Sequence, residues 1–214
     1  LRLNAPRETL ARECESAASR VGDAVVRAFV LRGAAGPGPL VDEPTRRLIL
    51  AEPAPNFDEV RARGATACVL ARAAFGTPEV AHAKYARYLP RLLARDEARA
   101  RGCDDALLAD DAGRILEAAT GSVFAVVRGG LVSASVLPGI TRATVLELAR
   151  GRGLGAELRA IEPSDLEGAS EMFVTSSVRE IVPIVRVDGR AVGAAVPGEI
   201  ARALQAALRS SLGR

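Results

Sequence analysis

Residues 113–133 read GRILEAATGSVFAVVRGGLVS, and this stretch decides the fold class. It contains three short apolar runs, at residues 114–118, 122–127 and 131–133, and glycine lies in each segment that separates one run from the next. Short β-rich runs joined by glycine turns are typical of consecutive antiparallel strands. We therefore expect a series of hairpin-connected strands in the middle of the chain.

The remaining sequence alternates between strand and helix patterns. Apolar and β-branched runs predict further strands over Ala24–Leu31, Arg47–Ala51, Ala65–Ala71, Ala106–Ala109, Met172–Thr175 and Ile181–Val187. Helical spacing and end signals predict helices over residues 6–20, 85–102, 141–152 and 198–212. Strands dominate and helices flank them, which predicts an α+β architecture rather than a doubly wound parallel sheet.

Two helices carry more detailed expectations. In the helix predicted over residues 85–102, Tyr88, Leu92 and Leu93 supply the apolar positions and charged residues fill the others. The sequence Ser164-Asp-Leu-Glu167 has the residue types of a capping box, which predicts that a short helix opens there.

A segment with two prolines, Glu52-Pro-Ala-Pro-Asn-Phe57, is the best candidate for a linker, because paired prolines block both a helix and a strand ladder. It predicts a boundary that divides the chain into residues 1–56 and residues 57–214. The first part has one helix and few strands, which is thin for an independent core. We therefore expect it to be the remainder of a small, incomplete N-terminal α/β domain with the linker, followed by a large C-terminal domain.

Composition argues against several classes of protein. The 214 residues include 29 basic and 26 acidic ones, a net charge of +3, while Trp is absent and aromatics make up 3%. Because the two signs of charge are interleaved and no stacking platform is visible, we expect no nucleic-acid partner. No apolar run approaches the roughly 20 residues that a membrane span needs, so we expect no membrane insertion.

Cysteine and histidine are too few for several kinds of site. Cys14, Cys68 and Cys103 lie far apart and are odd in number, which argues against a disulfide framework or a zinc site. His82 is the only histidine, so no Ser-His or Cys-His nucleophile pair can be built. We therefore expect no metal and a reducing compartment, the cytoplasm.

One lysine, Lys84, stands among 28 arginines. A chain that uses arginine wherever a surface charge suffices is expected to keep lysine where arginine cannot substitute. A guanidinium stays protonated, whereas an amine can lose its proton and attack a carbonyl. The alternative is that Lys84 is a chance survivor on a solvated face.

Three further places bear residues that complement this amine. Glu117 ends a short apolar strand, although a strand-end glutamate is more often solvated. The run Leu137-Pro-Gly-Ile-Thr-Arg142 places a glycine turn directly before a helix, which leaves backbone amides unpaired and suited to a phosphate. The run Thr175-Ser-Ser177 supplies hydroxyls; ordinary helix starts and loop caps use the same residues. An amine, a carboxylate and a phosphate cradle are the parts that a pyridoxal phosphate enzyme needs.

The order of these segments resembles the fold-type IV (class IV) aminotransferase family of pyridoxal phosphate enzymes. That family includes branched-chain aminotransferases, D-amino-acid aminotransferases and aminodeoxychorismate lyases. The segments that carry the resemblance are residues 83–89, 93–107, 113–124, 137–142 and 172–183. Together they cover about residues 60 to 214, and the resemblance implies a two-domain fold like that of D-amino-acid aminotransferase, with residues 57–214 as the cofactor-binding domain.

The resemblance implies a role for each matched residue. Lys84 corresponds to the Schiff-base lysine, which also moves a proton during the reaction, and Glu117 to the partner of the pyridine nitrogen. Ile140 and Thr141, which follow Gly139, correspond to the residues whose amides hold the cofactor phosphate. Ser177 corresponds to a hydroxyl on the same phosphate.

The chain also departs from the family pattern. Arg87 and Ser122 stand where the family usually has Asn, and Val178 and Arg179 stand where it has small residues. The resemblance implies that Arg87, Val178 and Arg179 contact substrate. The resemblance also implies an earlier stretch that holds an arginine on the cofactor phosphate, and we expect this stretch to be missing from the sequence as given.

The resemblance favours an aminotransferase with pyridoxal 5′-phosphate as cofactor. An amino acid and a 2-oxo acid are the expected small-molecule partners, and a homodimer with its active site between the two domains is implied. A lyase that forms 4-aminobenzoate and pyruvate from aminodeoxychorismate is the alternative with the same cofactor. The departures from the family pattern motivate a third possibility, a non-catalytic relative.

Overall fold

The computed structural model describes residues 6–31, 45–71, 84, 88–134 and 136–213. Two structural units divide the chain, Leu1–Asn56 and Phe57–Arg214. The division falls at the end of the proline-containing segment, at the same position as the predicted boundary. Each unit is described by itself.

The first unit is built on one helix and one hairpin-like strand pair. Helix α1 (Arg7–Ala18) follows Pro6, and strand β1 (Ala24–Leu31) pairs antiparallel with β2 (Arg46–Pro53). The Arg47 guanidinium binds the Glu13 carboxylate at 2.8 Å, which joins β2 to α1. No side chain of α1 is buried among the described residues, so this unit has little core of its own.

The second unit contains a nine-stranded sheet in the described part of the chain. Its strands are β3 (Ala65–Ala71), β4 (Asp105–Ala109), β5 (Ile115–Ala118), β6 (Ser122–Val127), β7 (Gly130–Ser133), β8 (Ala156–Leu158), β9 (Glu171–Ser176), β10 (Glu180–Val187) and β11 (Arg190–Ala191). The order is β5-β4-β3-β10-β9-β6-β7-β8, with β11 paired to β10. Strand β3 runs parallel to β4 and β10, whereas the β4–β5, β6–β7, β6–β9 and β9–β10 pairs are antiparallel. This mixed sheet confirms the α+β prediction.

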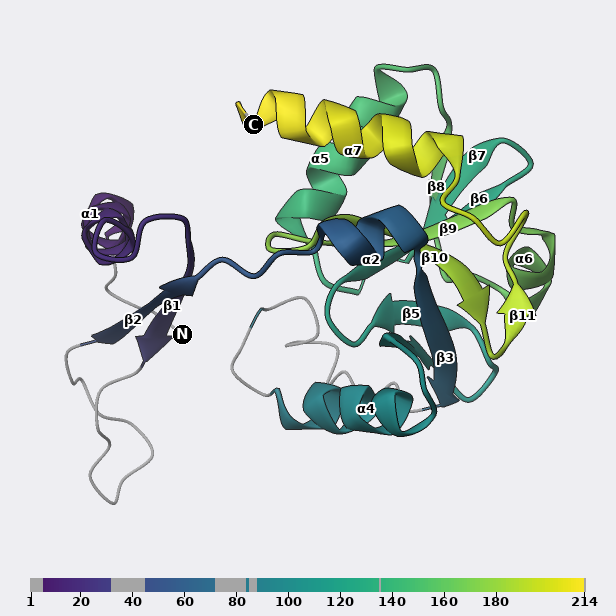
Figure 1. Ribbon diagram of the computed structural model, residues 1–214, viewed down its shortest axis with the longest axis horizontal. Helices are drawn as coiled ribbons and strands as arrows, with labels where there is room; N and C mark the ends of the chain where they lie inside the picture. The colour runs from purple at the N-terminus through teal and green to yellow at the C-terminus, as the bar shows by residue number, and fades with distance from the viewer. Residues whose placement is uncertain (1–5, 32–44, 72–83, 85–87, 135, 214) are drawn as a thin grey trace. The chain divides into compact units, whose positions relative to one another are not determined.

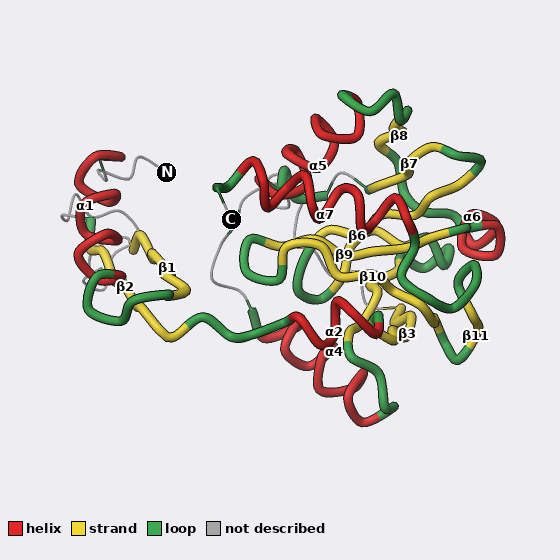
Figure 2. Tube along the Cα trace, turned by 45° about the horizontal axis from the view of Figure 1, so that its top comes forward, coloured by secondary structure: helices red, strands yellow, loops and turns green. Residues whose placement is uncertain are grey.

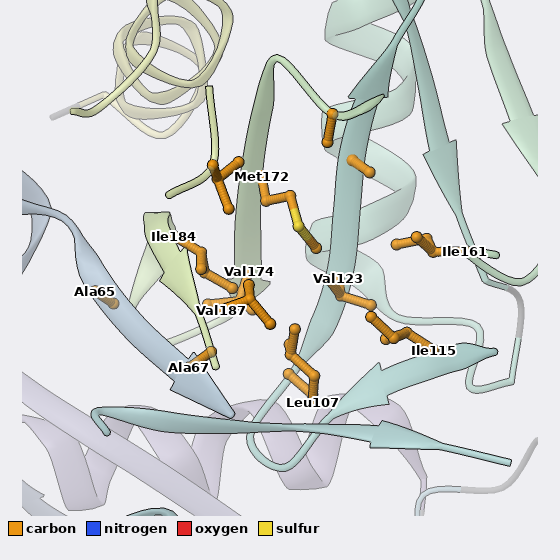
Figure 3. Close-up of a cluster of buried hydrophobic side chains, with 14 of the residues drawn as sticks. Ala65, Ala67, Leu107, Ile115, Val123, Ile161, Met172, Val174, Ile184 and Val187 are labelled. Carbon is orange, nitrogen blue, oxygen red and sulfur yellow. The ribbon is translucent and has the colours of Figure 1, made fainter. Parts of the chain in front are cut away.

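Strands β5 and β8 lie at opposite ends of the strand order, yet a bridge between Ile115 and Ile161 joins β5 to the segment that follows β8. The sheet is therefore curled, so that its two ends meet. Alternate side chains of each strand point into the curl and form one buried cluster, which Figure 3 shows. Leu107, Val123 and Val174 belong to this inner cluster. Their sequence neighbours point to the outer surface, where the helices cover them.

Five helices flank the sheet in the described residues of this unit. They are α2 (Asp58–Arg63), α4 (Leu89–Ala100), α5 (Ile140–Arg150), α6 (Pro163–Gly168) and α7 (Glu199–Ser211). Helices α5 and α7 lie side by side against β6, β9 and β10, over the stacked rings of Phe124 and Phe173, whose centroids are 4.9 Å apart (Figures 1 and 2). Helix α4 covers β3 and β4. Of the helices described, none is long and apolar enough to cross a membrane.

Three local expectations need correction. Tyr88, which precedes α4, and Leu92 and Leu93 within it are exposed, and the buried residues of this helix are Ala94 and Ala98. Small side chains let the helix approach β3 and β4 closely, and this packing outweighs the larger apolar surface of leucine. The capping box of α6 is formed by Glu162 and Asp165 rather than by Ser164 and Glu167, because Pro163 occupies the first turn.

The first two residues of the predicted linker, Glu52 and Pro53, instead end strand β2, and a helix that the sequence patterns do not predict follows the linker. Residues 58–63 form the short helix α2, whose start is marked by Asp58 and Glu59 and which ends at Gly64 with φ +77°. A Cβ at Gly64 would lie 2.3 Å from the Val185 side chain, so glycine permits both the positive φ and the close approach to β10.

Candidate active site

Glu117 lies near the end of β5, and its side chain belongs to the outer surface of the sheet. Its neighbour Ala118 points into the inner cluster, and alternation therefore turns Glu117 outward, toward α4. The residue is only 3% exposed. The Arg91 guanidinium, from the first turn of α4, forms an ion pair with its carboxylate and donates a second hydrogen bond to the Ala118 carbonyl at 3.2 Å. A buried carboxylate thus stands beside a fixed cation.

Burial and neighbouring charge act on Glu117 in opposite directions. Removal from water raises the pKa of this carboxyl, because the charged form loses its hydration. The charge and hydrogen bond of Arg91, and then the charges of Lys84 and Arg142, lower the pKa but do not cancel the effect of burial. The net result is a pKa above the usual range for glutamate.

Lys84 is near enough for its charge to act on Glu117. It lies outside helix and strand and is exposed. Arg142, in the first turn of α5, acts on the same carboxylate and is itself buried. The charges of the single lysine and of an arginine at the start of α5 thus both reach the buried Glu117 carboxylate.

Helix α5 starts without a side-chain cap among the described residues. Gly139 is the N-cap in an extended conformation, and Ile140 is 81% exposed at the first helical position. The first-turn amides of a helix have no intrahelical acceptor and favour an anion. A Cβ on Gly139 would lie 3.2 Å from the Ser122 hydroxyl, so this turn packs closely against the beginning of β6.

A buried hydroxyl lies next to this turn. Thr175 of β9 pairs with Ser122 of β6, and both residues are buried on the outer face of the sheet. The Thr175 hydroxyl has no hydrogen-bond partner in the part of the chain that the structure describes. Unpaired buried hydroxyls are uncommon, so a ligand at this position would satisfy one.

The group of residues fits pyridoxal 5′-phosphate. The unpaired amides at the start of α5 and the Thr175 hydroxyl suit the phosphate, and the Glu117 carboxylate suits a protonated pyridine nitrogen. The exposed Lys84 amine suits the aldehyde. Of the predicted site residues, Lys84 acts on Glu117 through its charge, and Ile140 lies in the same helical turn as Arg142, which does so too.

The other predicted site residues lie on the turn between β9 and β10 or outside the described residues. Ser177 and Val178 are exposed on this turn. Arg179 is 16% exposed, and its guanidinium binds the Asp105 carboxylate at 2.7 Å and the Thr120 hydroxyl. Arg87 lies outside the described residues.

The Asp105–Thr120–Arg179 contacts form an internal network. Asp105 is 1% exposed at the start of β4 and accepts a hydrogen bond from Thr120 at 2.8 Å. A Cβ on Gly121 would lie 2.1 Å from the Thr175 carbonyl oxygen, so the β5–β6 turn and the end of β9 are in direct contact. The network therefore fixes the β9–β10 turn relative to the segment that follows Glu117.

Sequence reasoning missed Arg91 and Asp105 as members of this region. Arg91 lies seven residues after Lys84 in a helix rich in arginine, and no local pattern separates it from Arg95 or Arg99. Its role depends on α4 packing beside β5, which only the tertiary structure shows. Thr175 was part of a predicted hydroxyl run, although Ser177 was preferred within it.

Comparisons with known proteins agree with the resemblance. A family model described as "Amino-transferase class IV" matches residues 1–187. The chain is 36% identical over 126 residues to a putative branched-chain-amino-acid aminotransferase of Methanocaldococcus jannaschii, covering 57% of this chain and 44% of that protein. It is 30% identical over 128 residues to a D-alanine aminotransferase of Bacillus licheniformis, covering 58% of this chain and 45% of that protein.

Solved structures share the fold. The branched-chain amino acid aminotransferase of Escherichia coli matches with a TM-score of 0.87 and 28% identity, over 100% of this chain and 73% of that one. The branched-chain amino acid aminotransferase of Thermobaculum terrenum, solved in its pyridoxal phosphate form, matches with a TM-score of 0.74 and 28% identity, over 86% of this chain and 62% of that one.

The matched regions set the extent of the similarity. The chain spans less than half the length of the two curated relatives named above, and 73% and 62% of the two solved chains. The prediction of a fold-type IV architecture is confirmed by the two solved structures. Because the family model covers most of the sequence, the chain belongs to the class IV aminotransferase family, whose cofactor is pyridoxal 5′-phosphate.

Proposed function

We propose that this protein is a pyridoxal phosphate-dependent aminotransferase that moves an amino group from an amino acid to a 2-oxo acid, with Lys84 as its catalytic residue. The observation that supports the proposal is a buried carboxylate, Glu117, reached by the charges of Lys84 and of Arg142 at the start of α5, in a chain of the class IV family. No other lysine is present in the sequence to take the role of Lys84.

Each residue has a separate task in this proposal. When bound, the cofactor supplies an electron-withdrawing ring that makes the proton on the α-carbon of the amino acid removable. The Lys84 amine holds the cofactor covalently and then carries that proton. Glu117 holds a proton at the pyridine nitrogen. The amides of Ile140 and Thr141 bind the phosphate, assisted by the hydroxyls of Ser177 and Thr175.

The substrates are proposed from the relatives and from the β9–β10 turn. The relatives are named for branched-chain amino acids and for D-alanine, so we propose an amino acid with a small or apolar side chain as donor. Val178 is the exposed apolar residue of the turn and is proposed to contact substrate. Arg179 is engaged with Asp105, and we propose that it positions the turn instead.

Two further proposals concern the oligomeric state and the cellular compartment. We propose that the protein acts as a homodimer. The cytoplasm is proposed as its compartment because Cys14, Cys68 and Cys103 carry free thiols in the structure.

The test is transamination by the purified chain loaded with pyridoxal phosphate. Individual amino acids are supplied with 2-oxoglutarate, and glutamate formation is measured. We expect glutamate with at least one donor, and none with Lys84→Ala or with Lys84→Arg, which keeps the charge but cannot form the covalent link. Arg190→Ala, in the exposed short strand β11, is the matched control and should keep full activity.

Two outcomes would overturn the proposal. Formation of 4-aminobenzoate from aminodeoxychorismate, without glutamate from any donor, would identify the lyase instead. Full activity of Lys84→Arg would show that the amine of Lys84 is not needed, and Lys84 would then be an ordinary surface charge.

A further inference from the structure

We propose that Arg91 is a positioning residue that keeps the Glu117 carboxylate ionised, so that the proton shared between this carboxylate and the cofactor lies on the pyridine nitrogen. This inference rests on the proposed function, because it takes Glu117 as the partner of the ring. It adds a residue that the sequence resemblance does not assign.

The geometry fixes the Arg91 guanidinium at two points. It forms the ion pair with Glu117 and donates to the carbonyl of the next residue, Ala118, at 3.2 Å. Pro90 lies in the first turn of α4, and the fully buried Ala94 and Ala98 hold this helix against the sheet. The cation is therefore carried by a rigid element and anchored to the same strand as the carboxylate.

In the described part of the chain, the other charged groups near Glu117 either act on it by their charge or form ion pairs with other residues. Lys84 and Arg142 contribute such fields. On the neighbouring strand β4, the carboxylate of Asp105 is paired with Arg179, and β6 carries no titratable residue. Among the described residues, Arg91 is thus the cation in direct contact with the Glu117 carboxylate.

This contact decides where a shared proton lies. Burial favours the neutral carboxylic acid, in which case the proton would leave the ring for Glu117. Arg91 touches the carboxylate, whereas the protonated pyridine nitrogen would lie on the far side of it. The Arg91 charge therefore stabilises the ionised carboxylate more than it repels the charge on the ring. With the carboxylate kept anionic, the ring keeps the proton that makes it electron-withdrawing.

The first test uses the cofactor-free protein and reads Glu117 directly. The carbonyl stretch of its protonated carboxyl is followed by infrared spectroscopy over a pH series and assigned by its loss in Glu117→Gln. We expect Arg91→Ala to raise the midpoint of this titration by one pH unit or more, a tenfold change in proton affinity. Arg91→Lys should restore most of the wild-type midpoint, and Arg95→Ala, one turn along α4, should leave it unchanged.

If Arg91→Ala does not fold, Arg91→Gln removes the charge while keeping a hydrogen-bond donor, and the same shift is expected. A folded Arg91→Ala or Arg91→Gln protein with the wild-type midpoint would overturn the inference. So would an equal shift in Arg95→Ala, because any arginine of α4 would then have the same effect.

The second test uses the loaded protein and separates this inference from the proposed function. We expect Arg91→Ala to lower turnover about tenfold and to move the pH profile of the bound cofactor's absorbance, with rescue of both by Arg91→Lys. Loss of activity in Lys84→Ala with an unchanged absorbance profile in Arg91→Ala would overturn the inference and leave the function intact. A protein that forms no product in wild type would overturn the function, while the cofactor-free titration would still decide whether Arg91 holds Glu117 ionised.

Discussion

Two buried glutamates of the second unit are held by arginine, yet their pKa values move in opposite directions. Glu180, 5% exposed at the start of β10, accepts hydrogen bonds from Arg209 at 2.9 Å and from Gln205 and lies 3.3 Å from Arg61. Burial raises its pKa, but the hydrogen bonds of Arg209 and Gln205, then the charges of Arg61 and Arg209, outweigh burial and lower it. At Glu117 burial prevails over Arg91, and the pKa is raised.

The difference lies in how far the fold compensates the charge of each carboxylate. Glu180 joins β10 to α2 and α7, and its charge is compensated within the fold. The charge of Glu117 is compensated only in part by the protein, and Glu117 lies deeper in the fold than Glu180, so burial weighs more on its carboxyl. A cation such as a protonated pyridine nitrogen would complete the compensation, and we infer that this is why the site tolerates the unfavourable burial.

The largest expected effect comes from changing Glu117, the carboxylate proposed to hold the cofactor. Glu117→Gln keeps the shape of the side chain but cannot hold a proton on the ring, so we expect turnover to fall by roughly 10²–10⁴-fold. The stability of the protein should not fall, because an incompletely compensated charge is removed. Steady-state kinetics and thermal unfolding measure the two quantities, and turnover within threefold of wild type would contradict the role of Glu117.

The second effect concerns the backbone that supports the site. Gly121→Ala places a Cβ where the Thr175 carbonyl oxygen lies, and we expect it to cost about 3 kcal/mol of unfolding free energy, at the upper end for overpacking. Gly168→Ala, where a Cβ meets nothing within 4 Å, is the matched control. Chemical denaturation compares the two, and equal stabilities would mean that the close contact at Gly121 is absent in solution.

The third effect concerns Glu180, the glutamate whose charge is compensated within the fold. Glu180→Gln removes the buried carboxylate that Arg61 and Arg209 share and leaves them the exposed Asp58, so we expect a loss of about 2 kcal/mol of unfolding free energy. Binding of pyridoxal phosphate, measured by absorbance titration, should stay near wild type. A Glu180→Gln protein that is as stable as wild type but cannot bind the cofactor would reverse the assignment of the two glutamates.

The smallest effect is a difference in pH dependence. Because the folded pKa of Glu180 is lowered, its stabilisation is present above the unfolded value of about 4.3 and is lost as the pH falls through the folded pKa. The raised pKa of Glu117 gives the opposite sign: its contribution is present below about 4.3 and declines as the pH rises through the folded pKa.

Denaturation at stepped pH measures these contributions. Relative to wild type, Glu180→Gln should lose less stability on acidification, and Glu117→Gln should gain stability between about pH 4.3 and neutrality. The same trend in both variants would contradict the opposed shifts.

Local sequence patterns predict most of the elements, though not α2 and β8, and they do not predict the contacts between elements. The strand Ser122–Val127 and the helix start at Gly139 follow from apolar runs and a glycine turn. The leucines of α4 were expected at apolar positions, whereas the helix packs through Ala94 and Ala98. On hydrophobicity alone, leucine is expected to be buried before alanine. The distance between α4 and the sheet depends on tertiary packing, which cannot be read from the sequence of either segment alone.

In the candidate site, too, the sequence indicates single residues, whereas the contacts between them need the tertiary structure. Lys84 and Glu117 stood out because of residue type and position, and their proximity needed the fold. Arg91 and the Asp105–Arg179 pair reach the region across long stretches of sequence, and in a chain with 28 arginines no composition signal separates these from the rest.

The most direct test of the central claim is to locate the amine that holds the cofactor. The chain is loaded with pyridoxal phosphate, treated with borohydride to turn the link between the aldehyde and an amine into a stable secondary amine, digested and read by mass spectrometry. We expect the phosphopyridoxyl group on Lys84 and its absence in Lys84→Arg. A group on the N-terminal amine alone, or no stable modification of a protein that still forms glutamate, would contradict the claim.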